Sequence, residues 1–163
     1  MKKVKRIVSL CIALVLVLAC FNGVTVLAQE EKPTITYNDE VMKGKGLQNV
    51  GDGNHSTAYV SEDAPDLSNG KQYLQFDWKD TVKINQVTLY ADFCGTTTKA
   101  GQAPTEWKIL LSTDGAIYTE AATATSEWND SDGVQSKALD FQAGQGFKSM
   151  RVVITKANLN WNH

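Results

Sequence analysis

Apolar residues recur at every second position in several short segments of the sequence, and this period narrows the folds that the chain can adopt. Leu74, Phe76 and Trp78, for example, alternate with polar residues. Because successive side chains of a strand point to opposite faces, each such segment predicts a strand with one buried face. The segments with this pattern are 73–78, 82–84, 86–91, 106–112 and 148–155.

Turn signals divide these segments, and no stretch shows the period of a helix. Ser112–Gly115 predicts a hairpin turn, because Gly115 can take a positive φ, and 117–122 is then the returning strand. Another short strand is expected at 136–141. Short strands joined by frequent turns indicate an all-β fold, either a sandwich or a barrel.

The N-terminal 28 residues are expected to be an export signal rather than part of the fold. Basic residues and then an apolar run fill 1–19, and 26–28 offers small residues for cleavage before Gln29. This predicts a secreted or cell-surface protein. A near-lipobox before Cys20 offers lipidation as an alternative, and a retained leader would be a short membrane anchor.

Charge and cysteine content exclude several classes of protein. The leader holds four of the 16 basic residues and none of the 18 acidic ones, so its removal leaves a net charge of about −6. The remaining basic residues are scattered, and nucleic-acid binding is not expected. Cys94 would be the only remaining cysteine, so no intrachain disulfide is possible, and an inert thiol is favoured over a reactive one. One domain is expected over 40–163, after a polar lead-in at 29–39.

The sequence offers no recognisable catalytic arrangement, so we do not expect an enzyme. Its two histidines are His55, which lies in a glycine-bearing loop, and His163, the last residue. Neither is a plausible base for a Ser-His-Asp or Cys-His arrangement. No spacing singles out a pair of carboxylates for glycoside hydrolysis.

The stretch Asn49–Tyr59, with sequence NVGDGNHSTAY, gathers oxygen-bearing side chains around two glycines. Two interpretations stay open at this stage. Calcium binds six to eight oxygen atoms, and a glycine-bearing loop can turn several carbonyls inward. Alternatively, the stretch is a tight turn that is held by hydrogen bonds of Asp52 alone.

Five segments in order resemble the discoidin domain, also called the coagulation factor V/VIII C-type domain, whose bacterial members include family 32 carbohydrate-binding modules. The resemblance covers roughly 120 residues and implies a jelly-roll β-sandwich with its binding loops at one end. The segments that carry it are Val50–Tyr59, Leu74–Trp78, Ile84–Tyr90, Trp107–Gly115 and Met150–Ala157.

In the family, the loop that resembles Asn49–Tyr59 often holds a structural calcium ion. The resemblance implies side-chain ligands from Asp52 and Thr57 and main-chain carbonyl ligands from Asn49 and Asn54. Family members add an acidic side chain from a final strand, which this sequence does not reach before His163. We therefore expect the domain to lack its C-terminal strand and the calcium site to be incomplete.

Sugar binding is the commonest role of the exported bacterial members. It needs an aromatic face and planar polar groups on loops over a rigid scaffold. The candidates by resemblance are Asp92, Phe93, Gln102, Asn158, Asn160 and Trp161. Val60 and Phe93 stand where galactose-binding members place a His and an Arg, so the resemblance implies a glycan ligand without implying galactose.

The four tryptophans receive different interpretations. Trp78 and Trp107 fall on inward strand faces and are expected in the core, while the role of Trp128 stays open. Trp161 is a candidate for stacking on a sugar, although a cap on one end of the sandwich is the alternative.

The sequence thus predicts an exported, non-catalytic carbohydrate-binding module at the N-terminal end of a larger glycan-active or surface protein. Its partner would be a glycan or a cell-surface polysaccharide, without membrane insertion of the mature domain. The alternative is an adhesion or protein-interaction module that uses the same loops. The sequence does not indicate an oligomeric state.

Overall fold

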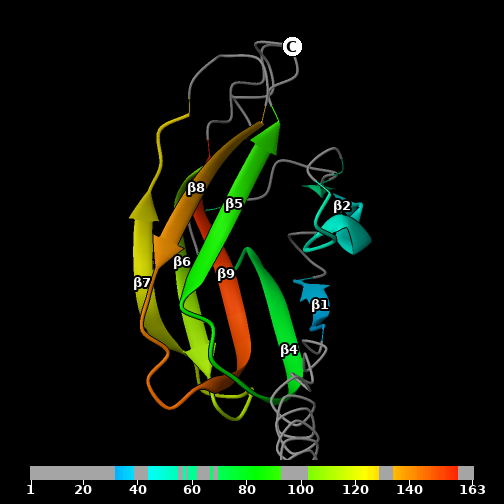
Figure 1. Ribbon diagram of the computed structural model, residues 1–163. Coiled ribbons are helices and arrows are strands. Elements are labelled where there is room, and N and C mark those ends of the chain that lie inside the picture. Colours follow the sequence, from blue (N-terminus) through cyan, green and yellow to red (C-terminus); the bar gives the residue numbers. More distant parts are fainter. Residues whose placement is uncertain are drawn as a thin grey trace, which may run out of the picture. The chain divides into compact units, whose positions relative to one another are not determined.

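The computed structural model divides the chain into two units, 1–32 and 33–163, and the described strands belong to the second. The residues that the structure describes are 32–38, 44–54, 57, 59–61, 67, 70–92, 103–128 and 134–157. Its elements (Figure 1) are β1 (Thr34–Tyr37), β2 (Gly44–Lys45), the 3₁₀ helix η1 (Leu47–Asn49), β3 (Val60–Ser61), β4 (Tyr73–Val82), β5 (Gln86–Asp92), β6 (Pro104–Ser112), β7 (Thr119–Thr125), β8 (Val134–Asp140) and β9 (Phe147–Ala157). Within these ranges, no helix is long and apolar enough to span a membrane.

Two antiparallel sheets form a sandwich. The larger sheet has five strands in the order β1-β4-β9-β6-β7, and β5 pairs with β8 in front of it (Figure 1). Strand β9 therefore lies between β4 and β6 and pairs with both. The short strands β2 and β3 pair with each other beside the edge strand β1 (Figure 1).

The core lies between the two sheets. Trp107 and Ile109 of β6 are fully buried, and they pack with Met150 and Val152 of β9. The partly buried residues that pack against this cluster come from both sheets and include Phe76, Trp78, Val87, Leu89 and Leu139. The indole N–H of Trp107 donates to Ser126 Oγ at 3.2 Å, so the one polar atom of this buried ring has a partner.

The alternation of apolar residues predicted the main strands correctly. Trp107 and Ile109 face inward as expected, and Trp78 packs on the core from β4. Strand β4 extends through Val82, and 83–85 connects it to β5, so 82–84 is not a separate strand. The all-β sandwich that the sequence predicts is confirmed.

Two strands differ from the expectation. Ile117 was expected in the strand after the hairpin turn, but β7 begins at Thr119 and the Ile117 side chain is 75% exposed. Its N–H donates to the Asp114 carboxylate, which holds the backbone in the turn. Residues 34–37 were expected in a polar lead-in, yet they form β1, because Ile35 pairs with Phe76 on the inward face.

Gly146 lies where the turn before β9 approaches the end of β4. Its φ is 98°, and a Cβ there would lie 2.7 Å from Thr81 Cγ2 and 2.9 Å from the Val82 carbonyl oxygen. Gly144 in the same turn also has a positive φ, of 56°, but a Cβ there would meet nothing within 4 Å. Position 146 thus requires glycine for two reasons, its positive φ and the lack of space for a Cβ. Position 144 favours glycine only because of its positive φ.

We expect Gly146→Ala to lower the free energy of unfolding by about 2–4 kcal/mol, and Gly144→Ala by about 1–2 kcal/mol, the usual cost of a left-handed L residue. Urea unfolding of both variants and the wild type measures the difference. Equal losses in the two variants would show that the contact with β4 contributes nothing.

Asp114 organises the hairpin turn between β6 and β7. Its Oδ1 accepts hydrogen bonds from the Ala116 N–H at 2.9 Å, the Ile117 N–H at 3.0 Å and the Ser112 hydroxyl at 2.9 Å. The bond from Ile117 contributes most, followed by those from Ala116 and Ser112, and together they lower the pKa of Asp114 from 3.8 to about 2. The ionised carboxylate therefore stabilises the folded turn.

This lowered pKa has a predictable effect on stability. A carboxyl group whose folded pKa is below its unfolded pKa stabilises the fold above about pH 4, and this contribution disappears as the pH falls toward about 2. We expect Asp114→Asn to be less stable than the wild type at neutral pH and the two urea midpoints to converge below about pH 3. A difference between the midpoints that does not change with pH would contradict this role.

Candidate functional site

The loop that follows η1 brings together three of the four predicted calcium ligands. Gly51 and Gly53, with φ of 71° and 76°, turn the chain on either side of Asp52. The Asp52 carboxylate accepts the Asn54 N–H on Oδ1 at 2.7 Å, and the Thr57 hydroxyl lies 2.6 Å from Oδ2. The same hydroxyl lies 2.8 Å from the carbonyl oxygen of Asn54.

The chemistry of this cluster suits a cation. Two oxygens, Asp52 Oδ2 and the Asn54 carbonyl oxygen, lie within hydrogen-bond distance of the Thr57 hydroxyl, which has a single proton to share between them. Such oxygens are the ligands that calcium prefers. Asn49, the fourth predicted ligand, ends η1, and its N–H bonds to the Gly46 carbonyl at 2.9 Å.

The same contacts also satisfy the alternative of a turn that is held by its own hydrogen bonds. Asp52 bonds to the backbone two residues later, which is an Asx turn. In the part of the chain that the structure describes, no three His, Cys, Asp or Glu side chains gather. A calcium ion at this loop would therefore depend on carbonyl and hydroxyl oxygens besides the carboxylate of Asp52.

The predicted sugar-binding residues belong, in sequence, to segments that begin or finish at strand ends on one side of the sandwich. At this end β5 finishes at Asp92 and β6 starts at Pro104, while β9 finishes at Ala157 beside Pro104 (Figure 1). Asp92 is the last residue of β5, and its side chain is not described. The other five candidates, Phe93, Gln102, Asn158, Asn160 and Trp161, lie outside the described residues. Their grouping stays a prediction.

Trp128, whose role the sequence left open, joins the strand ends at this site. It packs against Ala103 just before β6, and Ala91 near the end of β5 packs against the same alanine. Its indole N–H donates to the Pro104 carbonyl at 2.6 Å, and the Lys137 ammonium lies 5.6 Å from the ring centroid. Trp128 therefore holds the start of β6, and Ala103 connects it to the end of β5. No periodic pattern surrounds Trp128 in the sequence, so this role could not be predicted from residue spacing.

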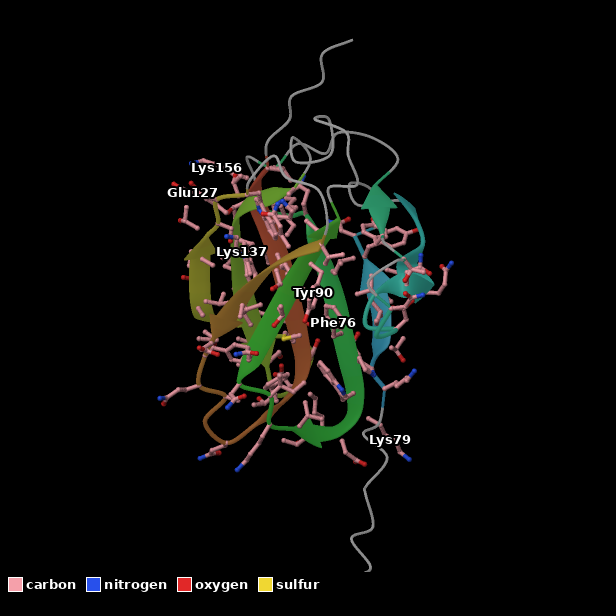
Figure 2. The ribbon with its side chains drawn as sticks, turned by 45° about the horizontal axis from the view of Figure 1, so that its top comes forward. Phe76, Lys79, Tyr90, Glu127, Lys137 and Lys156 are labelled. Carbon is pink, nitrogen blue, oxygen red and sulfur yellow. The ribbon has the colours of Figure 1, made fainter. Side chains whose placement is uncertain are left out.

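Charged side chains of both signs occur near the described strand ends on this side of the sandwich. Lys156 Nζ lies 2.5 Å from Glu106 Oε1, which joins β9 to β6. Lys137 lies over the Trp128 ring, and Glu127 precedes Trp128 in the chain; Figure 2 labels Lys137, Glu127 and Lys156. The end that adjoins the predicted ligands is therefore of mixed charge rather than a basic or acidic patch.

Comparison with known proteins identifies a domain family whose sequence model matches this chain. The sequence model of the F5/8 type C domain matches residues 34–163, from β1 onward and through the Asp52 loop. No curated protein sequence matches the chain.

Solved structures that resemble the chain include modules from Clostridium perfringens. The CBM32-1 and CBM32-2 domains of ZmpB superpose on 80% of this chain with a TM-score of 0.59 at 18% identity. The same domains in complex with GalNAc give 0.58 over 80%, also at 18% identity. CBM32-1 of a family 31 glycoside hydrolase gives 0.57 over 82% at 16% identity.

The share of each relative that is covered differs. The chain spans 33% and 32% of the two ZmpB structures and 92% of the single CBM32-1 module. At these identities the similarity concerns the fold, and it confirms the jelly-roll sandwich that the sequence resemblance implied.

Proposed function

The chain belongs to the F5/8 type C (discoidin) domain family, and on this premise we propose that it is a carbohydrate-binding module. The observation that carries the proposal is the match of four fifths of the chain to CBM32 modules, one set of which was solved with GalNAc. The proposed ligand site is the end of the sandwich at which β5 and β9 finish and β6 begins.

Residue chemistry at this end supports a glycan. Phe93 and Trp161 would supply aromatic faces for the apolar side of a sugar ring, and the amides of Gln102, Asn158 and Asn160 would bind its hydroxyls. Ala91 and Trp128 both pack on Ala103 where β5 ends and β6 begins, so loops of this site would rest on a fixed base. Rigid support of this kind reduces the entropy lost on binding.

We further propose that the module is exported, does not catalyse a reaction, and forms part of a larger glycan-active or surface protein. The leader-like residues 1–28 support export, and the ZmpB structures, in which modules of this fold share a chain, support the larger context. A linked module raises the effective concentration of its partner on a polymer, so weak affinity at each site suffices.

Calcium is proposed as a structural ion of the Asp52 loop. Asp52 and Thr57 would bind it through side-chain oxygens, and Asn49 and Asn54 through carbonyls. The clustered oxygens of Asp52, Asn54 and Thr57 support this set. The ion would stabilise the loop rather than take part in sugar chemistry.

The glycan proposal predicts binding on an array of neutral and acidic glycans by the purified protein. We expect Trp161→Ala to weaken binding of the best glycan about tenfold or more, because one stacked aromatic contributes on the order of 1.4 kcal/mol. Trp161→Phe, which keeps an aromatic face, should retain most of the affinity. A folded protein that binds no glycan would refute the proposal and favour the protein-interaction alternative.

The calcium proposal predicts a rise in melting temperature when Ca²⁺ replaces EDTA, because an ion that binds the folded state alone stabilises it. Asp52→Asn and Thr57→Val should abolish the rise, and Thr57→Ser should keep it. Asp114→Asn is the matched control, because Asp114 also precedes a glycine in an exposed turn. A rise that survives both Asp52→Asn and Thr57→Val would place the ion elsewhere.

A further inference from the structure

The outer face of the five-stranded sheet carries a chain of polar contacts that the proposed sugar site does not use. Gln75 pairs with Arg151 and Asp77 with Ser149 across β4 and β9. Their side chains point to the face opposite the core residue Phe76. This face is turned away from β5 and β8, which lie in front of the sheet in Figure 1.

Asp77 is at the centre of these contacts. Its Oδ1 accepts the Ser149 hydroxyl at 2.6 Å, and its Oδ2 accepts the Gln75 amide N–H at 2.8 Å. The Gln75 carbonyl oxygen in turn accepts Arg151 Nε at 2.8 Å. Both carboxylate oxygens thus accept hydrogen bonds from neutral donors. Asp77 and Arg151 form no direct ion pair, and the side chain of Gln75 bridges them by hydrogen bonds.

Two tyrosines fix the guanidinium of Arg151. Its Cζ lies 3.7 Å from the centroid of the Tyr118 ring and 4.2 Å from that of Tyr73. The Tyr118 hydroxyl lies 2.6 Å from Ser149 Oγ. Because Ser149 gives its single proton to Asp77, Tyr118 must be the donor to Ser149. The hydrogen bonds therefore run in one direction, from the Tyr118 hydroxyl to Ser149 and from Ser149 to the Asp77 carboxylate. We call Arg151 and the side chains that hold it the clamp around Arg151; these side chains are Tyr73, Gln75, Asp77, Tyr118 and Ser149.

The fork of Arg151 keeps most of its binding capacity. A guanidinium has five N–H groups, and Nε uses one of them on Gln75. Within the described residues, the two terminal nitrogens make no hydrogen bond and Arg151 forms no ion pair. A half-buried, immobilised guanidinium with free terminal N–H groups presents the planar geometry that carboxylates and sulfates bind with two parallel hydrogen bonds.

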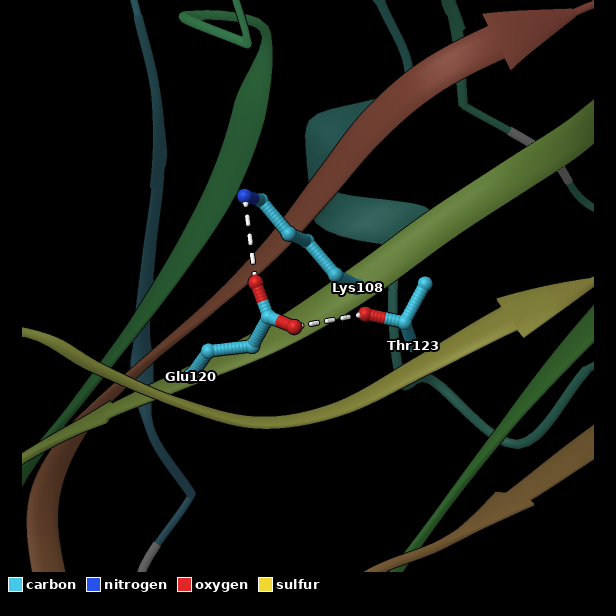
Figure 3. Close-up of polar contacts among 3 residues, drawn as sticks. All are labelled: Lys108, Glu120 and Thr123. Carbon is cyan, nitrogen blue, oxygen red and sulfur yellow. Dashed lines mark hydrogen bonds and ion pairs between the residues drawn. The ribbon is translucent and has the colours of Figure 1, made fainter.

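Neighbouring charges do not occupy this fork. Lys108 and Glu120 pair with each other at 3.3 Å, and Thr123 donates to the second oxygen of Glu120 at 2.9 Å (Figure 3). The residue opposite Arg151 in β6 is Leu110, which has no charge. The nearest described ionic pair on this face is therefore already satisfied.

Threonine hydroxyl groups lie on the same face, between the clamp around Arg151 and the sheet edge at β1. Thr36 and Thr34 of β1 pair with Gln75 and Asp77, and both threonines are exposed. A ligand on Arg151 would thus lie close to the rings of Tyr73 and Tyr118, with threonine hydroxyls toward the sheet edge. This combination favours an acidic sugar over an isolated anion, because the sugar ring can use both kinds of contact.

We propose that Arg151, held between Tyr73 and Tyr118, forms a second ligand site on the outer face of the five-stranded sheet, which binds the carboxylate or sulfate group of an acidic glycan. The choice of a glycan rests on the function proposed above. The site lies on a sheet face rather than at the strand ends, so the two sites are separable by mutation.

Arginine-selective ¹⁵N labelling tests this site directly, because Arg6 and Arg151 are the only arginines in the sequence. The purified protein is titrated with a uronic acid oligosaccharide, its carboxyl-reduced neutral form, and the neutral form bearing sulfate esters. We expect the Arg151 Nε–Hε resonance, assigned by its loss in Arg151→Lys, to shift with one or both acidic probes and not with the neutral one. The two acidic arms identify carboxylate or sulfate as the group bound.

Variants separate a specific fork from general charge attraction. Arg151→Lys keeps the positive charge but loses the planar fork, and we expect at least about a tenfold loss of affinity for the acidic probe. Lys108→Gln, the matched control, removes a cation from the same face and should change that affinity less than about twofold. Binding of a neutral glycan at the strand ends should be unchanged in both variants.

Several outcomes would overturn the proposal. One is an Arg151 resonance that does not shift at millimolar concentrations of the acidic probes. This titration uses the wild type, so its result does not depend on whether Arg151→Lys folds. Another is an equal loss in Arg151→Lys and Lys108→Gln. If the Arg151 site fails but a neutral glycan binds in a way that depends on Trp161, the proposed function stands. If an acidic glycan binds at Arg151 and no binding depends on Trp161, only the site at the strand ends is refuted.

Discussion

The register of β9 is the constraint on which both faces of the large sheet depend. This strand pairs with β4 on one side and β6 on the other, so its alternation must serve two neighbours at once. Met150 and Val152 enter the core, while Ser149 and Arg151 face outward. A slip of one residue would place Arg151 against Trp107 and Ile109 and would remove the outer contacts together with the core. The buried cluster therefore also positions the clamp around Arg151.

Residue alternation predicted those strands whose one face is buried by several apolar side chains. Strands β4, β6 and β9 meet this condition, and their inward residues were identified correctly. The period fails where a segment is short, as in β1, whose four residues are ordered by pairing with β4. It also fails where a local hydrogen bond competes with the ladder. Ile117 looks like a strand residue in sequence, but the carboxylate of Asp114 keeps it in the turn.

The candidate sites differ in how far the sequence reveals them. Asp52, Asn54 and Thr57 lie within six residues of one another, so a local stretch shows their shared chemistry. The clamp around Arg151 joins residues that are 31 to 76 positions apart, and it exists only after three strands and a hairpin have been assembled. Trp128 is a similar case, because its partners Ala103 and Pro104 adjoin it through the fold and not through any repeat in the sequence.

The position of β9 between two earlier strands also affects the order of folding. During synthesis β4 and β6 emerge first, and neither is the other's neighbour in the finished sheet. The pairing of Gln75 with Arg151 closes a separation of 76 residues, and contacts so distant in sequence form slowly. The large sheet is therefore completed late, after most of the domain has been made. Export is proposed above, and for an exported chain this delay would keep the polypeptide unfolded until β9, the last central strand, is available.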